Sequence, residues 1–346
     1  MSDEMWAGVW SGLGRMEVVR RPLQQPARGE TRVRVEACGV CGSDLHIYRA
    51  PGLVAKGMTL GHEVVGMVES VGEDVPGWRP GDRVTVEPLL SCGRCEMCRQ
   101  GCDNRCSEYR LIGMQEPGGF SEYLVVPAHR LYAVPEDLAA PLAALSEPVA
   151  VVVHALQLGG FVAGQRVLVL GGGTIGLLTA AVARLWGAGE IALTARHPHQ
   201  AALARRLGAS DVFEPGEVGP GELPQQLQSR PPDLVVETVG GEAETLASAA
   251  EAVRPGGTVV VLGVFTREIR LDPMVLLKKE VGLRWSLCYT RTEAGADFTA
   301  AIRLLAAHRE LFASILTHEV PLAEIGRAFA LADDKSSGAI KVTVVL

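Results

Sequence analysis

The sequence predicts an α/β fold in which a doubly wound parallel sheet is inserted into a β-rich domain. Before about residue 137, short valine-rich segments are bounded by Gly, Pro or Asp, and helical periodicity is scarce. After about residue 165, continuous apolar runs alternate with Ala- and Leu-rich segments, which is typical of buried parallel strands and their connecting helices. The expected division is a first domain over 1–153, an inserted domain over 154–296 and a C-terminal return over 297–346.

The individual elements follow from these patterns. Strands of the first domain are expected at 31–36, 63–71 and 83–87. Strands of the inserted domain are expected at 166–170, 190–194, 233–237, 257–263 and 282–286. Helices are expected between them at 175–186, 200–207 and 243–253. The Pro- and Gly-rich stretch 214–232 is predicted to be the most mobile surface segment.

Composition excludes several classes of protein. A chain of 346 residues with 47% hydrophobic and 21% charged residues is far from disorder and buries a large core. A net charge of −7 argues against nucleic-acid binding, and eight cysteines are too few for a disulfide scaffold. The acidic N-terminus lacks the pattern of an export signal, and no uncharged stretch reaches membrane-spanning length. We therefore expect a cytoplasmic protein with no membrane partner, whose reduced cysteines are free to bind metal.

A glycine-rich turn after the predicted strand 166–170 predicts a dinucleotide site. It has the form G-x-G-x-x-G and opens a helix, whose N-terminal N–H groups and dipole favour a pyrophosphate. The motif alone is weak, since glycine is common in this chain, but its strand–helix context makes it specific. Residues assigned to the cofactor here, and after two later strands, are Gly171, Gly173, Thr174, Ile175, Gly176, Val239, Gly240, Leu262, Gly263 and Val264.

The end of the next predicted strand indicates which dinucleotide binds. An NAD site usually has Asp or Glu about 20 residues after the motif, to accept a hydrogen bond from the ribose 2′-hydroxyl. Here the position is Ala195, and Arg196 follows. A guanidinium can pair with a 2′-phosphate, so NADP(H) is predicted, with His197 and His199 as possible additional contacts. The alternative is that Arg196 only stacks on the adenine and that NAD is also used.

Four cysteines within fifteen residues predict a structural zinc site. Cys92, Cys95, Cys98 and Cys106 supply four thiolates, which suits a closed tetrahedral site. Cys102 lies within the same loop and could replace Cys106 or stay free. The alternative is a loop of spare thiols without metal. Protein ligands at all four positions would give this zinc a structural role.

A second set of ligand types is spread along the chain. One thiolate, one imidazole and one or two carboxylates from this set could hold zinc with a position left open for chemistry. Its members are Cys38, Cys41, Ser43, Asp44, His46, His62, Glu63 and Glu147. Four of these residues have a simpler alternative. Cys38 and Cys41 could form a redox pair, although the usual strand–C-x-x-C–helix context is not expected here. His62 could be a core histidine, and Glu147 an acid in the first turn of a helix.

Together these motifs resemble the zinc-dependent medium-chain dehydrogenase/reductase family, which includes alcohol, sorbitol, threonine and butanediol dehydrogenases. The most specific part is Gly61-His62-Glu63-x₂-Gly66-x₅-Gly72, joined by the four-cysteine loop and the glycine-rich turn. The resemblance extends from residue 7 to residue 345. It implies a GroES-like β-barrel catalytic domain, containing the structural zinc lobe at about 90–108, with an inserted Rossmann domain.

The resemblance also implies residue roles. Cys41 and His62 match catalytic zinc ligands, and Glu147 stands where many alcohol dehydrogenases have a second cysteine. In the polyol and threonine branch Glu63 is also a ligand or an exchangeable one, so both carboxylates are named. Roles away from the ligands are implied for Ser43 and His46 (proton relay), Asp44 (orienting a ligand) and Lys341 (reaching the cofactor pyrophosphate).

The predicted function is hydride transfer between NADP(H) and a secondary alcohol, vicinal diol or polyol, with two zinc ions per chain in a homodimer or homotetramer. The segment 287–292 resembles the polyol and butanediol branch. The alternative is NAD-dependent oxidation of an amino alcohol, as in threonine dehydrogenases. A nucleic-acid-binding zinc protein and a zinc-free relative of the same fold are the rivals from other classes. Net acidity opposes the first, and the presence of both ligand sets opposes the second.

Overall fold

The computed structural model describes residues 3–214, 222–292 and 295–346. The chain divides into two compact units, of which unit 1 comprises residues 1–150 and 290–346 and unit 2 comprises residues 151–289. The sequence placed the two boundaries at 153/154 and 296/297. Part of the stretch 214–232, predicted to be mobile, lies outside the described residues.

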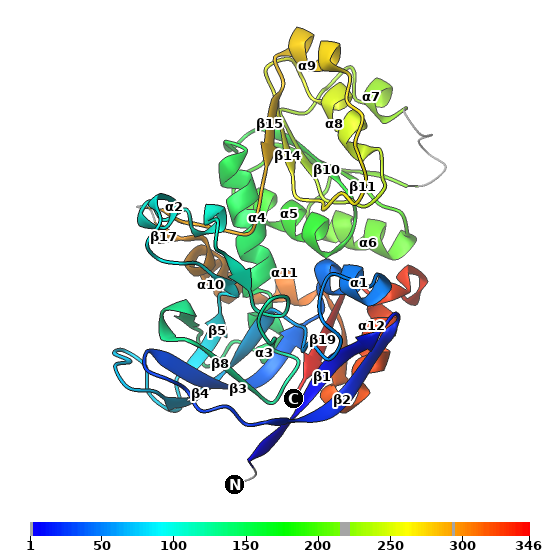
Figure 1. The fold of residues 1–346 in the computed structure, drawn as a ribbon. Coiled ribbons are helices and arrows are strands. Elements are labelled where there is room, and N and C mark those ends of the chain that lie inside the picture. The colour runs from blue at the N-terminus through cyan, green and yellow to red at the C-terminus, as the bar shows by residue number, and fades with distance from the viewer. Residues whose placement is uncertain (1–2, 215–221, 293–294) are drawn as a thin grey trace. The chain divides into compact units, whose positions relative to one another are not determined.

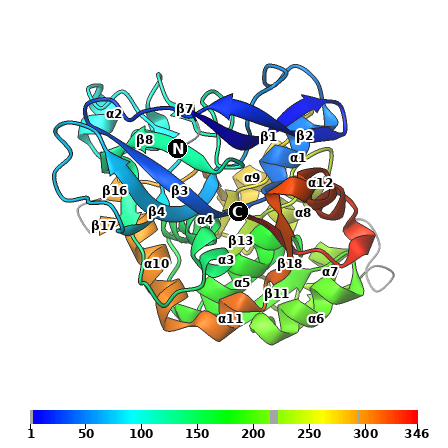
Figure 2. The ribbon, with the colours of Figure 1, turned by 90° about the horizontal axis from the view of Figure 1, so that it is seen from below.

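Unit 1 is built on a seven-stranded sheet with the order β18-β19-β3-β4-β5-β9, in which β8 also pairs with β3 (Figure 1). The C-terminal strand β19 (Lys341–Val345) pairs with β3 (Glu30–Gly39), so the end of the chain returns to the N-terminal sheet, as Figure 2 shows from below. The sheet strands are completed by β4 (Glu63–Val71), β5 (Arg83–Val86), β8 (Tyr123–Pro127), β9 (Leu131–Ala133) and β18 (Leu316–Pro321).

Smaller elements surround this sheet. Paired strands are β1 (Glu4–Gly12) with β2 (Arg15–Pro22), β6 (Leu89–Leu90) with β7 (Arg110–Leu111), and β16 (Arg291–Thr292) with β17 (Gly295–Ala296). The helices are α1 (Gly42–Arg49), α2 (Glu96–Arg99), α3 (Ala140–Ala144), α10 (Asp297–Ala307), α11 (Arg309–Ala313) and α12 (Ile325–Asp333). The core contains many valines and aromatic rings, among them Phe120 and Phe329, whose centroids lie 5.6 Å apart.

Unit 2 is a parallel sheet with the order β12-β11-β10-β13-β14-β15. Its strands are β10 (Arg166–Leu170), β11 (Glu190–Thr194), β12 (Asp211–Phe213), β13 (Leu234–Glu237), β14 (Thr258–Val261) and β15 (Gly282–Trp285). Its helices are α5 (Thr174–Leu185), α6 (Pro198–Leu207), α7 (Leu223–Gln226), α8 (Thr245–Ala252) and α9 (Pro273–Lys279). The predicted fold class is confirmed, since the central strands are buried and apolar as parallel strands require.

Helix α4 (Ser146–Leu158) spans the first boundary. Residues 140–158 form a helical stretch long and apolar enough to cross a membrane, but 78% of its apolar 18-residue segment is buried inside the protein. The core helix of a globular domain has this property.

Candidate active site

The register between β3 and β4 brings the predicted catalytic ligands together. Gly39 at the end of β3 pairs with Glu63 at the start of β4, and the chain leaving β3 reaches Cys41 two residues later. His62 precedes Glu63, so all three ligand types meet at one end of the strand pair. Their ligand atoms lie within 4.8 Å of one another. Thiolate, imidazole and carboxylate are zinc ligands, and their convergence fits a zinc ion.

Two glycines leave room for this arrangement. A Cβ added at Gly39 would lie 2.0 Å from Glu63 Oε2, so any side chain there would displace the carboxylate. Gly61 has φ +93°, and a Cβ there would lie 2.7 Å from Cys38 Sγ and 2.9 Å from the Phe120 ring. The signature glycine before His62 is therefore required by both backbone conformation and packing.

Helix α1 holds Cys41 and brings a carboxylate near His62. Asp44, in the first turn, accepts a hydrogen bond from Cys41 N (2.9 Å), and its other oxygen lies 3.7 Å from His62 Nδ1. Burial lowers the pKa of His62, but the negative charges of Asp44 and Cys41 outweigh it and raise that pKa well above its usual value. An excess of buried anionic groups is the environment that a cation stabilises.

Lys341 lies in this cluster, on the sheet side. Its ammonium forms an ion pair with Glu63 and donates to Val40 O (3.0 Å), and both charged side chains are 1% exposed. The family resemblance predicts that this side chain reaches the cofactor pyrophosphate. The structure gives it buried partners within unit 1 instead, and contact with a pyrophosphate stays a prediction.

Glu147 and the relay residues surround the ligand group. Glu147, in the first turn of α4, is buried but does not belong to the group within 4.8 Å. Burial, reinforced by the negative charge of Glu63, raises its pKa to about 7. Ser43 and His46 lie on α1, each partly buried. Burial and the nearby Arg49 lower the pKa of His46, so its imidazole is neutral at pH 7.

The redox-pair alternative for Cys38 and Cys41 depended on local structure. The expectation that a strand–C-x-x-C–helix arrangement is missing was wrong, because β3 precedes the motif and α1 follows it. Cys38 is nevertheless completely buried, and burial, followed by the negative charges of Asp44 and Glu63, raises the pKa of its thiol well above the usual value. A buried, protonated thiol is a poor redox nucleophile.

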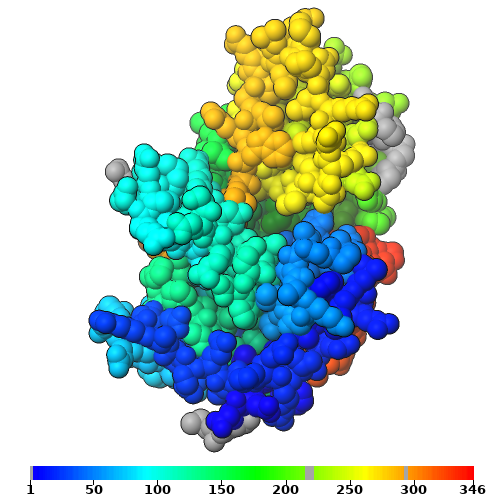
Figure 3. Space-filling view, in the orientation of Figure 1, coloured from blue at the N-terminus to red at the C-terminus, as the bar shows by residue number. Residues whose placement is uncertain are grey.

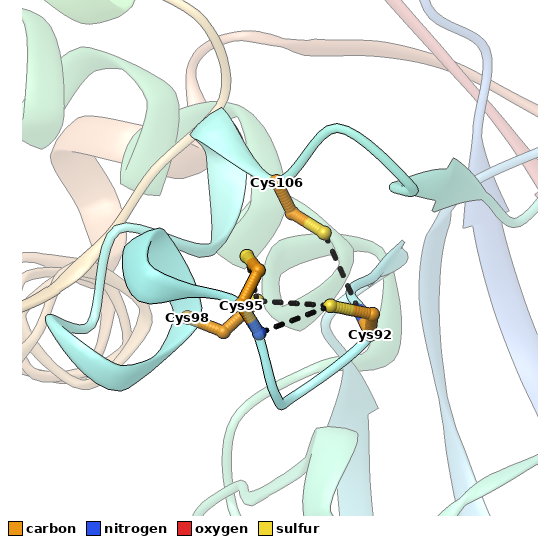
Figure 4. A group of neighbouring side chains, drawn as sticks. All are labelled: Cys92, Cys95, Cys98 and Cys106. Atoms are coloured by element: carbon orange, nitrogen blue, oxygen red, sulfur yellow. Dashed lines mark hydrogen bonds between the residues drawn. The ribbon is translucent and has the colours of Figure 1, made fainter.

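The predicted structural zinc lobe forms a second ligand group. Cys92, Cys95, Cys98 and Cys106 have ligand atoms within 4.8 Å of one another, and Figure 4 shows the four sulfurs converging. Cys92 Sγ and Cys95 Sγ lie 3.9 and 3.4 Å from Cys98 Sγ, close to the ~3.8 Å expected between thiolates around a tetrahedral zinc. Cys102 is outside the group, with its Sγ 3.9 Å from Gln100 O.

Backbone amides support the charged form of these sulfurs. Cys92 Sγ accepts from Cys95 N (3.4 Å), and Cys106 Sγ accepts from Cys92 N (3.5 Å) and Glu108 N (3.4 Å). Hydrogen bonds from the backbone of Arg94 and Cys95 lower the pKa of Cys92 to about 6. Such N–H···S contacts stabilise the thiolate of Cys92, whereas burial raises the pKa of Cys98 to about 12. The lobe therefore fits zinc in its donor type and in the convergence of its sulfurs.

The glycine-rich turn of unit 2 has the geometry of a phosphate site. Gly171 has φ +112°, and a Cβ at Gly176 would lie 1.8 Å from Gly171 O, so both residues are required by the turn itself. A Cβ at Gly173 would meet no protein atom within 4 Å. Gly173 is also the N-cap of α5 and makes no side-chain cap, so the helix N-terminus faces open space where a pyrophosphate fits.

The end of β11 carries the residues expected to select the dinucleotide. Ala195 is buried, with its Cα 3.3 Å from the position of a Cβ on Gly172, whereas Arg196 is exposed. Gln200 Oε1 accepts from Arg196 N (3.0 Å) and His197 N (3.2 Å), so a side-chain amide holds this turn. The rings of His197 and His199 stack with centroids 5.4 Å apart.

The remaining predicted cofactor residues lie in two neighbouring turns of unit 2. Val239 and Gly240 follow β13, and Leu262, Gly263 and Val264 follow β14. Gly241 N donates to Val264 O (2.7 Å), which ties the two turns together. Two residues that hold turns in unit 2 were not predicted from the sequence: Glu237, which accepts hydrogen bonds from the turn after β13, and Gln200, which accepts them from the turn after β11. A buried acid at the end of an apolar run was the available signal for Glu237.

Comparison with known proteins agrees with this geometry. Residues 27–136 match the alcohol dehydrogenase GroES-like domain, and residues 174–307 match the zinc-binding dehydrogenase family. The chain is 32% identical over 335 residues to a sorbitol dehydrogenase of Halalkalibacterium halodurans, covering 96% of both chains. A 2-dehydro-3-deoxy-L-galactonate 5-dehydrogenase of Pseudoalteromonas atlantica is 31% identical, with 96% of this chain and 97% of that protein covered.

Solved structures extend the likeness to the whole fold. A zinc-binding dehydrogenase of Sinorhizobium meliloti with bound NADP is 32% identical, with a TM-score of 0.90 and 100% of both chains covered. An alcohol dehydrogenase of Thermus sp. ATN1 is 33% identical, with a TM-score of 0.87 and 99% of both chains covered. The chain therefore belongs to the zinc-dependent medium-chain dehydrogenase family and is an enzyme of the alcohol and polyol dehydrogenase class.

Proposed function

We propose that this enzyme transfers hydride between NADP(H) and a secondary alcohol, vicinal diol or polyol, with catalytic zinc held by Cys41, His62 and Glu63. The convergence of these three ligand types within 4.8 Å carries the proposal. Zinc bound there would supply Lewis-acid chemistry, which lowers the pKa of an alcohol hydroxyl. Glu147 is the second carboxylate of the site, and its buried position suits exchange with Glu63 or a hydrogen bond to a bound water.

The chain's own residues would manage the proton. Ser43 and His46 lie one turn apart on α1, so both side chains belong to one face of the helix. The neutral imidazole of His46 can accept a proton and release it to solvent. Asp44 accepts from Cys41 N and lies 3.7 Å from His62 Nδ1, so its negative charge would help to orient the imidazole.

The metal assignment is tested by Cys41→Ser. We expect it to abolish alcohol oxidation and to remove one zinc per chain, with NADPH binding unchanged. Cys102→Ser is the matched control, since Cys102 lies outside both ligand groups. Metal analysis should find two zinc ions per wild-type chain and one in Cys41→Ser. Full activity of Cys41→Ser would refute the assignment.

Cofactor preference follows from the turn after β11. The buried Ala195 leaves space beside the exposed guanidinium of Arg196, which favours a 2′-phosphate. Arg196→Ala should reduce kcat/KM for NADP⁺ by about tenfold or more, because hydrogen bonds to charged groups contribute roughly 1.5–3 kcal/mol. The kcat/KM for NAD⁺, which has no 2′-phosphate, should change little. A wild-type enzyme with the higher kcat/KM for NAD⁺ would overturn the NADP assignment.

The substrate class is supported by the named relatives. They include sorbitol dehydrogenase and D-xylulose reductase A, and also L-threonine 3-dehydrogenases, which represent the alternative of an amino alcohol oxidised with NAD. A panel of diols, polyols, secondary alcohols and threonine with NADP⁺ and NAD⁺, followed at 340 nm, separates the two. Threonine with NAD⁺ as the best pair would support the alternative.

We also propose a cytoplasmic homodimer or homotetramer. Strand β15 is the last strand of the parallel sheet, and Trp285 on it is 55% exposed. Met274 and Leu277 on α9 are 49% and 69% exposed, and this region forms the surface at the top of Figure 3. An open strand edge beside exposed apolar side chains favours pairing with a second chain. Light scattering after size exclusion measures the assembly, and a monomer would refute it.

A further inference from the structure

Glu237, the last residue of β13, is a buried carboxylate that the proposed function leaves without a role. Its exposed fraction is 0%. Oε1 accepts three hydrogen bonds, from Val239 N (2.8 Å), Gly240 N (3.1 Å) and the Thr245 hydroxyl (2.7 Å). One oxygen atom therefore fixes the turn after β13 and the first residue of α8.

The same residue also holds the turn after β14. Its main-chain carbonyl accepts from Leu262 N (2.8 Å) and Gly263 N (3.1 Å). Oε2 lies against Gly263, where an added Cβ would be 2.3 Å from it. The main chain at 237 thus holds the turn after β14, and the Glu237 side chain packs against Gly263 of that turn.

Ion pairing does not account for this carboxylate. The ion pairs within the described part of unit 2 do not include Glu237, and Oε2 has no hydrogen-bond partner among the described residues. Burying a carboxylate without a cation beside it reduces the stability of the fold, and a neutral side chain at this position would reduce it less. What the carboxylate does have is three hydrogen bonds to Oε1 from the turn and from Thr245.

The two turns lie where a doubly wound sheet binds its ligand. They follow the adjacent parallel strands β13 and β14, at the carboxyl edge of the sheet. Thr238, next to Glu237, bonds to Leu170 O through its hydroxyl (2.8 Å) and its N–H (3.0 Å), which links the turn after β13 to the glycine-rich turn. Val239 and Val264 are 39% and 61% exposed and give these turns an apolar surface suited to a planar ring.

We propose that Glu237 is a positioning residue for hydride transfer: by fixing both turns it sets the orientation of the nicotinamide half of the dinucleotide, and it leaves the adenosine half unaffected. The inference rests on the proposed function, because it assumes that a nicotinamide dinucleotide binds at this edge. It differs from a purely structural role, since it places the effect of Glu237 in the chemical step.

The test compares Glu237→Ala and Glu237→Gln with Asp233→Asn. Asp233 lies just before the first residue of β13, whereas Glu237 is its last residue. The Asp233 carboxylate accepts from Arg166 N (2.8 Å) and Arg254 Nε (2.6 Å). Asp233→Asn therefore controls for the loss of a carboxylate that bonds to the backbone. For each protein we would measure the thermal midpoint, the affinities for NADPH and for adenosine 2′,5′-bisphosphate, kcat, and the primary deuterium isotope effect on kcat with a deuterated alcohol.

We expect Glu237→Ala to lower kcat by about tenfold or more and to raise the isotope effect, because a displaced nicotinamide slows hydride transfer. Affinity for adenosine 2′,5′-bisphosphate should stay within about twofold of wild type. Glu237→Gln keeps one acceptor oxygen, so its kcat should lie between those of Glu237→Ala and wild type. If Glu237→Ala does not fold, Glu237→Gln is the variant that tests the proposal. Asp233→Asn should lower the thermal midpoint and leave kcat and the isotope effect unchanged.

Equal loss of affinity for NADPH and for adenosine 2′,5′-bisphosphate, or an unchanged isotope effect with reduced stability, would show that Glu237 is only structural. Wild-type protein gives the separate check on the proposed function. Absence of NADPH binding or of alcohol oxidation in wild type would overturn that function, and this inference with it.

Discussion

At the scale of single residues, two glycines of one motif are required for different physical reasons. Gly176 is required by the protein, because a Cβ there would lie 1.8 Å from the backbone oxygen of Gly171. Gly173 has φ −78° and ψ −176°, which any residue can adopt, and a Cβ there meets nothing within 4 Å. The protein itself therefore does not require glycine at 173, whereas a pyrophosphate approaching the N-terminus of α5 would.

This difference predicts that Gly173→Ala and Gly176→Ala separate binding from folding. Gly173→Ala should leave the thermal midpoint unchanged and weaken NADPH binding by about tenfold, because the methyl group occupies space for the pyrophosphate. Gly176→Ala should reduce the free energy of unfolding by about 1–3 kcal/mol as well, because the turn must shift. Thermal unfolding and NADPH fluorescence titration measure both. A destabilised Gly173→Ala would contradict the account.

At the scale of elements, one buried network joins the zinc lobe to the sheet of unit 1. Arg130, after β8, pairs with Glu87 and also contacts Asp103 (3.0 Å) within the lobe. Glu87 Oε2 accepts from the Tyr132 hydroxyl (2.8 Å) and from Arg291 (2.8 Å), so three segments distant in sequence meet at one carboxylate. The Arg130 and Glu87 side chains are 2% and 3% exposed, so the pair is shielded from solvent.

Arg130→Met should therefore destabilise the protein strongly. Removing one partner leaves the buried Glu87 undercompensated, which lowers the free energy of unfolding by about 3 kcal/mol. The control is Arg94→Met in the same lobe, where the Arg94 and Glu108 side chains are 77% and 56% exposed. That change should alter stability by less than about 1 kcal/mol. Urea denaturation measures both, and equal effects would refute the distinction.

At the start of β13, Asp233 predicts a pH dependence. Burial raises its pKa, but hydrogen bonds from Arg254 and from the backbone of Arg166 outweigh this and hold the pKa below its ordinary 3.8. A folded-state pKa below the unfolded value means that the stabilisation is complete above pH 3.8 and is lost as pH falls through the folded pKa. The difference in unfolding free energy between wild type and Asp233→Asn should therefore shrink as pH falls below about 3.8. A difference that stays constant would exclude this linkage.

At the scale of the whole molecule, the two kinds of cofactor site belong to different units. Both metal-ligand groups lie in unit 1, and the dinucleotide turns lie in unit 2. The two sites therefore depend on different cores.

Metal removal should accordingly abolish activity and spare dinucleotide binding. After treatment with a chelator, alcohol oxidation should be lost, and the Kd for NADPH should stay within about threefold of its original value. The thermal midpoint should fall, because the four-cysteine lobe loses its ligand. Titration with NADPH fluorescence before and after treatment, with zinc added back as the control, measures this. Loss of NADPH binding in parallel with zinc would show that the units depend on each other.

The sequence by itself determined the features with a local chemical signature. Strands at 63–71, 166–170 and 190–194 have the predicted bounds, because an apolar run ended by Gly or polar residues signals a strand without tertiary information. Helix α1 was not expected, because its eight residues are largely polar and it is held by Asp44 and the packing of unit 1. The four-cysteine loop could be identified from its spacing, and the glycine-rich turn from its spacing together with the strand before it and the helix after it.

Only the tertiary structure decided which distant residues meet. The register of β3 with β4 and β19 places Glu63 beside Cys41 and buries Lys341 against it, whereas Glu147 lies outside the ligand group. The role of Glu87 likewise depends on partners that the fold brings in from distant parts of the chain. Hydrogen bonding and ion pairing act over a few ångströms in space, and sequence spacing reports them only within one turn or one loop.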